Sequence, residues 1–162
     1  MNADSNLVSN KVHTDASWKT ILECAAIEVL EMMAGLRPEP NASSTDEPSG
    51  EQTAMVGMAG ALCGITTVRC SNATAIKLAS LMLGGASANA SGASDALGEI
   101  CNMIAGNFKS KISGLADHCM LSVPTVISGE DYSMEPAQPA ESINVCLNLN
   151  GQPLWVSLII HG

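Results

Sequence analysis

A glutamate and an asparagine lie three residues apart in the segment EICNMIAG, at Glu99 and Asn102, and a glycine follows at Gly106. Residues three apart on a helix are neighbours, so the carboxylate and the amide would share one small surface. An asparagine side chain can accept a hydrogen bond from a water molecule and fix the direction of its attack. A carboxylate can pair with a lysine of a partner protein. Together they fit phosphoryl chemistry, in which positioning supplies much of the rate.

The residues around this pair predict a helix from about Ser94 to Ile112. At about 100° per residue, one stripe is apolar and should face the core. Its members are Leu97, Ile100, Cys101, Ile104, Ala105, Phe108 and Ile112. The opposite side carries Asp95, Glu99, Asn102 and Gly106, with Met103 beside them.

An ordinary solvated helix face would also carry acids and amides. A glycine on such a face, however, costs about 0.5–1 kcal/mol relative to alanine. Gly106 and the adaptable Met103 therefore favour a surface that docks on another protein, with Asp95, Met103 and Gly106 as the partner contacts.

Composition and length fit one domain, which we expect over residues 16–162 after a polar N-terminal arm at 1–15. The 162 residues are 46% hydrophobic but only 2% aromatic. The core must therefore be built from aliphatic residues together with the nine methionines and six cysteines.

The net charge of −9, with only seven Lys and Arg, argues against binding to nucleic acid or to an anionic membrane surface. No apolar run reaches membrane-spanning length, and the N-terminus lacks a signal peptide, so we expect a cytoplasmic protein. The six cysteines contain no C-x-x-C pair and the three histidines do not cluster near them. We therefore expect reduced, mostly buried thiols and no metal site or thiol chemistry of the protein's own.

The first half of the chain predicts helices and a hairpin. A helix is expected from about Ala16 to Leu36, followed by an exposed loop at 37–52. Small and β-branched residues predict strands at 53–59 and 62–70 around a turn at Gly60. Ser71 or Asn72 can cap a helix at 73–83, a flexible connection follows at 84–93, and Ser94 or Asp95 caps the helix that carries Glu99.

The second half predicts strands. Residues 119–127 form one strand, in which Pro124 indicates an edge, a bulge or a break. Residues 143–149 and 154–160 each alternate apolar and polar side chains and predict two strands. They flank Asn150-Gly151, the dipeptide typical of a tight hairpin. Helices segregated beside a mainly antiparallel sheet make an α+β domain.

A short echo connects the two long helices. Glu28–Gly35 reads EVLEMMAG and Glu99–Gly106 reads EICNMIAG, with Glu31 in the place of Asn102. Composition alone can make such helices alike. We favour a true repeat, in which two pseudo-symmetric helices pack on the sheet.

The segment SDALGEICNMIAGNFKSKI resembles the signature helix of the CheX group within the CheC/CheX/FliY phosphatases of bacterial chemotaxis. Its motif is E-x-x-N with a glycine four residues after the Asn, which Glu99, Asn102 and Gly106 match. MVGMAGALCGITTVRCS is similar to the central hairpin of the family, LSVPTVISG to the strand after the signature helix, and AAIEVLEMMAG to the first helix.

The resemblance implies a phosphatase of CheC-like fold that dephosphorylates the aspartyl phosphate of a CheY-like response regulator. Asn102 would orient the attacking water, and Glu99 would pair with the lysine in the active site of the regulator. The regulator would supply Mg²⁺, so that the phosphatase needs no cofactor of its own. Relatives of this kind can be homodimers. Glu31, where two-site relatives have Asn, implies that the first helix carries no active site.

The alternative is a module that binds a receiver domain or dimerises without catalysis. The intact Glu99–Asn102 pair favours the enzyme.

Overall fold

The fold is built on one antiparallel sheet, seen in a computed structural model that describes residues 16–41, 51–130 and 132–161. Within these residues seven strands pair in the order β1-β6-β7-β3-β2-β4, and β5 also pairs with β2. The predicted polar arm, 1–15, lies outside the described residues. The strands are β1 (Glu39–Pro40), β2 (Gln52–Gly60), β3 (Gly64–Cys70), β4 (Cys119–Leu121), β5 (Thr125–Ser128), β6 (Ala140–Leu149) and β7 (Gln152–His161).

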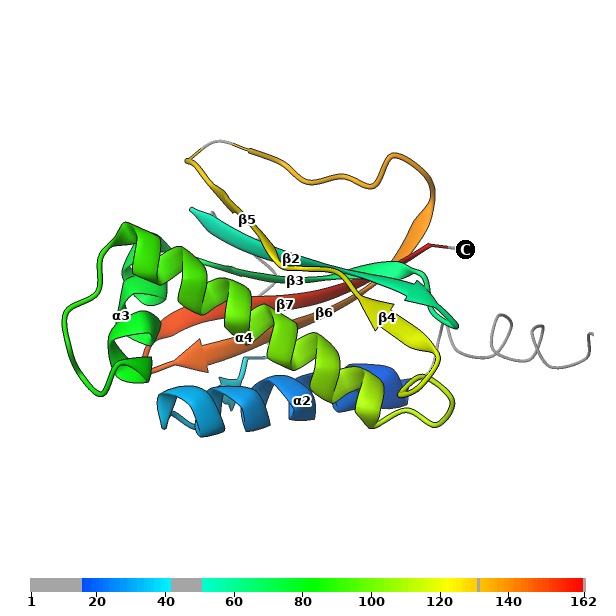
Figure 1. Ribbon diagram of the computed structural model, residues 1–162, viewed down its shortest axis with the longest axis horizontal. Coiled ribbons are helices and arrows are strands. Elements are labelled where there is room, and N and C mark those ends of the chain that lie inside the picture. The colour runs from blue at the N-terminus through cyan, green and yellow to red at the C-terminus, as the bar shows by residue number, and fades with distance from the viewer. Residues whose placement is uncertain (1–15, 42–50, 131, 162) are drawn as a thin grey trace, which may run out of the picture.

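Two long helices lie on the same face of this sheet (Figure 1). The first, α2 (Ala16–Ala34), contacts β6 and β7, while α4 (Ala90–Ser110) crosses β2 and β3 and also contacts α2. A shorter helix, α3 (Asn72–Met82), packs against both at one end of the molecule. The α+β prediction is confirmed, and so is the packing of both long helices on an antiparallel sheet. Their relation by a local two-fold axis stays a prediction.

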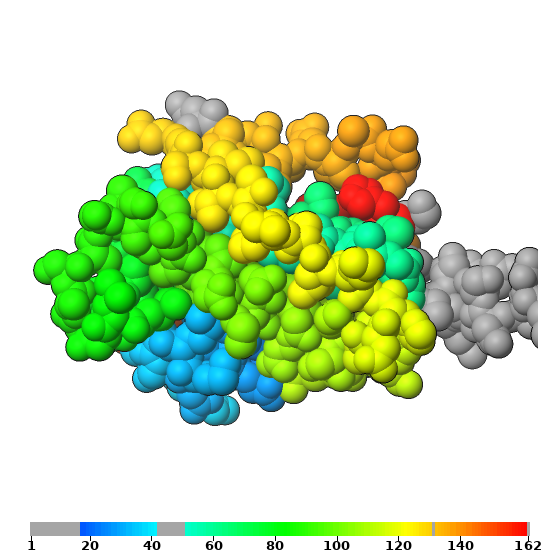
Figure 2. Space-filling model, viewed as in Figure 1, coloured from blue at the N-terminus to red at the C-terminus, as the bar shows by residue number. Residues whose placement is uncertain are grey.

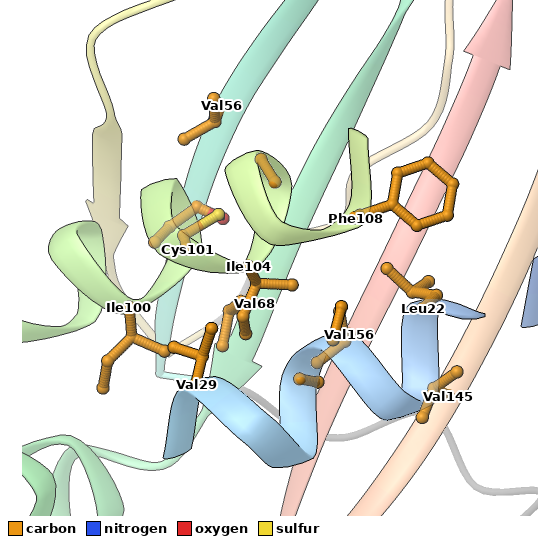
Figure 3. Packing of buried hydrophobic residues seen from close by; sticks show 14 of the residues in the cluster. Leu22, Val29, Val56, Val68, Ile100, Cys101, Ile104, Phe108, Val145 and Val156 are labelled. Atoms are coloured by element: carbon orange, nitrogen blue, oxygen red, sulfur yellow. The ribbon is translucent and has the colours of Figure 1, made fainter. Parts of the chain in front are cut away.

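The buried stripe of α4 holds this helix on the sheet. All its predicted members from Leu97 to Phe108 are buried, and Ile112 is partly buried beyond the end of the helix. Figure 3 shows Ile100, Cys101 and Ile104 of α4 among side chains of α2 and the sheet. At the other end of the interface, the rings of Trp18 and Phe108 meet edge to face with centroids 5.4 Å apart. The opposite side of α4 is therefore fixed toward solvent.

The start of α4 differs from the prediction. The helix begins at Ala90, inside the segment expected to be a flexible connection, and neither Ser94 nor Asp95 is its cap. Asn89 caps it instead, because its side-chain Oδ1 accepts a hydrogen bond of 2.8 Å from the amide of Gly92. Of the two caps predicted for α3, the structure has Ser71 and not Asn72: the Ser71 side chain accepts from the amide of Thr74 at 3.1 Å.

Turns and breaks in the sheet follow special residues. At the β6–β7 turn, Asn150 and Gly151 have φ of 51° and 91°, as a tight hairpin requires. At the end of β2, Gly60 has φ of 120°, and a side chain there would collide with the carbonyl oxygen of His118. Pro124 breaks the predicted strand 119–127 into β4 and β5, which both pair with β2.

Candidate functional site

The exposed side of α4 presents the residues that the sequence singled out. Glu99 and Asp95 are exposed, while Asn102, Met103 and Gly106 are partly exposed. Among the residues that the structure describes, the side chains of Glu99 and Asn102 have no hydrogen-bond or ion-pair partner. The predicted exposure is confirmed. A carboxylate and an amide therefore stand free on a rigid helix, one turn apart, with their hydrogen-bonding capacity available to a partner.

A shallow groove passes over α4 beside Asn102. Its volume is about 460 Å³, and it is open to solvent. Residues of α2 line one side of it and Leu121 of β4 lines the other. The lining residues are Glu28, Val29, Met32, Asn102, Met103, Gly106, Asn107, Ser110 and Leu121. The groove thus places apolar side chains of α2, α4 and β4 beside Asn102, whereas Glu99 is not among its lining residues.

Sequence reasoning missed the residues that α2 and β4 contribute to this groove. The α2 residues among them, Glu28, Val29 and the 66% exposed Met32, have a visible sequence signal, since all three lie in the echo EVLEMMAG. Leu121 has none, because only the pairing of β4 with β2 brings it to α4.

Gly106 is one of the α4 residues that line the groove. A Cβ atom at this position would meet only the Cδ1 atom of Leu121, at 3.9 Å, which is an ordinary contact. Packing within the protein therefore does not require glycine here, even though glycine weakens a helix. The missing side chain instead leaves the helix backbone open to the groove at this position.

We expect Gly106→Ala to increase stability and reduce function. Removing glycine from a helix interior should raise the free energy of unfolding by about 0.5–1 kcal/mol. Tm should rise with it, since 1 kcal/mol corresponds to about 2–4 °C for a domain of this size. The added methyl group should at the same time obstruct docking. Thermal denaturation and a receiver-binding titration on the same sample measure both effects.

Gly92→Ala is the matched control, because it makes the same change in the first turn of α4, where the added Cβ would lie 3.4 Å from Asn89 Oδ1. A Gly106→Ala protein that is more stable and binds its receiver as well as wild type does would contradict the docking role of Gly106.

A polar cluster ties α2 to α4 at the edge of the groove. The Lys111 ammonium lies 2.9 Å from one carboxylate oxygen of Glu28 and donates to the other at 3.0 Å. The amide of Asn107 donates to Glu28 at 2.8 Å and to the carbonyl oxygen of Ala25 at 3.3 Å. These hydrogen bonds, that from Lys111 first and that from Asn107 next, lower the pKa of the Glu28 carboxyl. The cluster therefore fixes the spacing of the two helices that border the groove.

The stability that the Glu28 cluster provides should depend on pH. A carboxyl whose pKa is lowered by folding stabilises the protein above its unfolded pKa of about 4.3, and this contribution is lost as pH falls through the lower, folded value. We expect Glu28→Gln to lower Tm slightly at pH 7, and the difference from wild type to shrink below about pH 4. Glu39→Gln, at an exposed position on β1, is the control. A Tm difference that does not change from pH 7 to pH 3 would argue against the ionic role of Glu28.

The residues of α2 that match Asn102 and Gly106 have different surroundings. Glu31, in the place of Asn102, pairs with Arg37 at 3.1 Å, and both side chains are exposed. Gly35, in the place of Gly106, has φ of 65° just beyond the end of α2, whereas Gly106 lies inside α4. The likeness between the two segments therefore does not extend to a second polar pair.

The six cysteines differ in their burial. Four are buried, while Cys24 and Cys63 are exposed. Burial raises the pKa of the Cys70 and Cys101 thiols to about 12, and it also raises that of Cys119. Cys101 donates weak hydrogen bonds to the carbonyl oxygens of Ala54 and Thr66. These three thiols thus act as core groups.

The described residues contain no group of three or more His, Cys, Asp or Glu side chains placed to hold a metal ion. None of the helices in 16–41, 51–130 and 132–161 has the length and apolar character needed to cross a membrane.

Comparison with known proteins identifies the family. The model of the family described as "Chemotaxis phosphatase CheX" matches residues 52–148, which include the whole of α4. The chain belongs to this CheX family. It is 30% identical over 126 residues to the CheY-P phosphatase CheX of Thermotoga maritima, with 75% of this chain and 81% of that protein covered.

Solved CheX structures share the fold. A CheX from Desulfovibrio desulfuricans has a TM-score of 0.77 at 24% identity, covering 90% of this chain and 99% of that one. The CheX in the CheX–CheY–BeF₃–Mg²⁺ complex from Borrelia burgdorferi has a TM-score of 0.74 at 22% identity, covering 90% and 98%. The resemblance on which the CheC-like fold was predicted is therefore confirmed.

Proposed function

We propose that this protein removes the phosphoryl group from the aspartate of a CheY-like response regulator. The observation that carries the proposal is the exposed, unpartnered pair of Glu99 and Asn102 on α4. In a chain of the CheX family, this pair lies where a second protein can reach it. The CheY-P phosphatase of Thermotoga maritima and the CheX–CheY complex from Borrelia burgdorferi support the choice of partner.

In this proposal Asn102 acts on the attacking water. Its side-chain oxygen accepts a hydrogen bond from the water and aims the water oxygen at phosphorus, in line with the bond to the aspartyl oxygen. That bond breaks as the new one forms, giving inorganic phosphate and a free aspartate, and the proton of the water passes to phosphate or solvent. The gain in rate comes from orientation, because the amide is neither a nucleophile nor a base.

Glu99 positions the partner. Its carboxylate pairs with the lysine beside the aspartyl phosphate and so sets the register between the two proteins. Asp95, Met103 and Gly106 complete the contact surface. Desolvation of the charge pair in the complex strengthens it relative to an exposed pair.

The partner supplies the metal. Mg²⁺ is present in the CheX–CheY complex from Borrelia burgdorferi together with BeF₃. For this protein we propose that the Mg²⁺ binds to the receiver and that the phosphatase contributes no ligand or cofactor.

The first helix carries no second site in this proposal. A carboxylate at Glu31 would repel the phosphoryl oxygens where Asn102 would bind a water, and Glu31 already pairs with Arg37. Action in the cytoplasm, association of two copies, and the absence of nucleic-acid and membrane partners remain proposals, supported by the family resemblance and the net charge of −9.

The test is phosphate release from a panel of phosphorylated receiver domains, with and without the protein. We expect it to accelerate the decay of at least one receiver well beyond its spontaneous rate, and only when Mg²⁺ is present for the receiver. If the protein binds a receiver but accelerates the decay of none in the panel, the non-catalytic binding module becomes the correct function.

A further inference from the structure

The strongest unassigned feature is an exposed apolar residue on the segment between β4 and β5. Val123 is 84% exposed, the highest value among the exposed large hydrophobic residues in the described part of the chain. It belongs to the β4–β5 linker, residues 122–124, which Pro124 creates by breaking the strand. No part of the sequence reasoning gave this linker a role.

The linker runs beside Asn102. Gly98, Asn102 and Gly106 follow one another at i+4, so they form one line along α4. A Cβ atom at Gly98 would lie 3.5 Å from Pro124 Cβ, and one at Gly106 would lie 3.9 Å from Leu121 Cδ1. The chain between Leu121 and Pro124 therefore passes the middle of that line, where Asn102 stands. Figure 2 shows this segment, in yellow, along the surface of α4, with α2 in blue on the other side.

The linker is held firmly. Ser122 donates its amide to the carbonyl oxygen of Gly57 at 2.9 Å, and its hydroxyl oxygen accepts from the Gly57 amide at 2.8 Å. At Pro124, two residues after Ser122, the proline ring fixes φ. Val123 is thus an apolar side chain presented on an ordered backbone, and burying it would require little loss of conformational entropy.

We propose that Val123 is a docking residue for the phosphorylated receiver, which must place an apolar side chain next to its lysine. This inference rests on the proposed function and adds a contact from outside α4. The site then has an acidic side at Asp95 and Glu99, complementary to a lysine, and an apolar flank at Val123, with Asn102 between them. The chain carries 16 Asp and Glu against 7 Lys and Arg, so charge alone would attract the receiver lysine to many parts of its surface. The apolar contact at Val123 then sets the register between the two proteins.

The test compares polar substitutions at two neighbouring exposed residues. Val123→Ser and the nearly isosteric Val123→Thr remove apolar contact area without adding charge. Met120→Ser is the matched control: Met120 is 77% exposed, but it points to the other face of the sheet from Leu121, because side chains alternate along a strand. Decay of the phosphorylated receiver is followed over a range of receiver concentrations, and receiver affinity is measured by calorimetry.

We expect Val123→Ser to raise KM and Kd about tenfold, with kcat unchanged within about twofold, and Val123→Thr to lie between Ser and wild type. Met120→Ser should behave as wild type. Unchanged KM and Kd in Val123→Ser, or equal loss in Met120→Ser, would overturn the inference while leaving the proposed function intact. A change of oligomeric state in Val123→Ser by light scattering would reassign Val123 to self-association and overturn it as well. If wild type neither binds nor dephosphorylates any receiver in the panel, both the proposed function and this inference are overturned.

Discussion

Alanine in place of Asn102 is expected to lower the maximal rate of receiver dephosphorylation by about 10²-fold or more, the size of loss seen when one positioned transition-state donor is removed. Orienting a water is useful only in the transition state, so the loss should appear in kcat. The fold should survive, because Asn102 lies outside the buried stripe of α4 and has no partner among the described residues. Circular dichroism and thermal denaturation check this before the decay of phosphorylated receiver is measured.

Two further variants separate a positioning role from a general surface effect. Asn102→Asp keeps the shape but adds a negative charge beside the phosphoryl group, so it should be at least as damaging as alanine. Glu31→Ala changes the corresponding residue of α2, whose carboxylate pairs with Arg37, and should leave turnover within about twofold of wild type. Near-native kcat in Asn102→Ala would refute water positioning. A large loss in Glu31→Ala would show that the first helix takes part after all.

Changing Glu99 should act mainly on the encounter with the receiver. Glu99→Ala removes the partner of the receiver lysine and should raise KM about tenfold, equivalent to about 1.4 kcal/mol, with a further loss in kcat because the complex docks out of register. Glu99→Lys places like charges opposite each other and should be worse. The salt dependence of KM should also weaken in Glu99→Ala, since one attractive charge is gone. Steady-state kinetics at two ionic strengths provides these values.

Glu39→Lys makes the same charge reversal at the other edge of the sheet from β4, on an exposed residue of β1. It should alter KM much less than Glu99→Lys does. Equal effects of the two reversals would mean that only the overall charge of the protein matters, and Glu99 would lose its role as a specific contact.

The sequence was most informative for α4, in which one side packs on the core and the other is exposed. The apolar stripe from Leu97 to Phe108 identified the buried side of α4, and the exposure of Glu99 and Asn102 followed from it. The β6–β7 turn was equally predictable, because Asn150-Gly151 accepts positive φ at both residues.

What the sequence missed depends on contacts between distant segments. Asn89 is one of several polar residues in GGASANASGA, and only the packed helix shows which of them caps its start. Strand β1, two residues long, exists through its pairing with β6. Pro124 indicated an irregularity in its strand, but not that the resulting linker would lie along Asn102. For the same reason the groove, which α2 and β4 complete, had no signal in the motif itself.

Asn102 is expected to speed hydrolysis within a complex that forms without its help. The direct measurement is the decay of phosphorylated receiver under single-turnover conditions, across increasing concentrations of wild type and of Asn102→Ala. We predict the same half-saturating concentration for both proteins and a plateau rate at least about 10²-fold lower for the variant. Equal plateau rates, or a loss that appears only as weaker half-saturation, would contradict it.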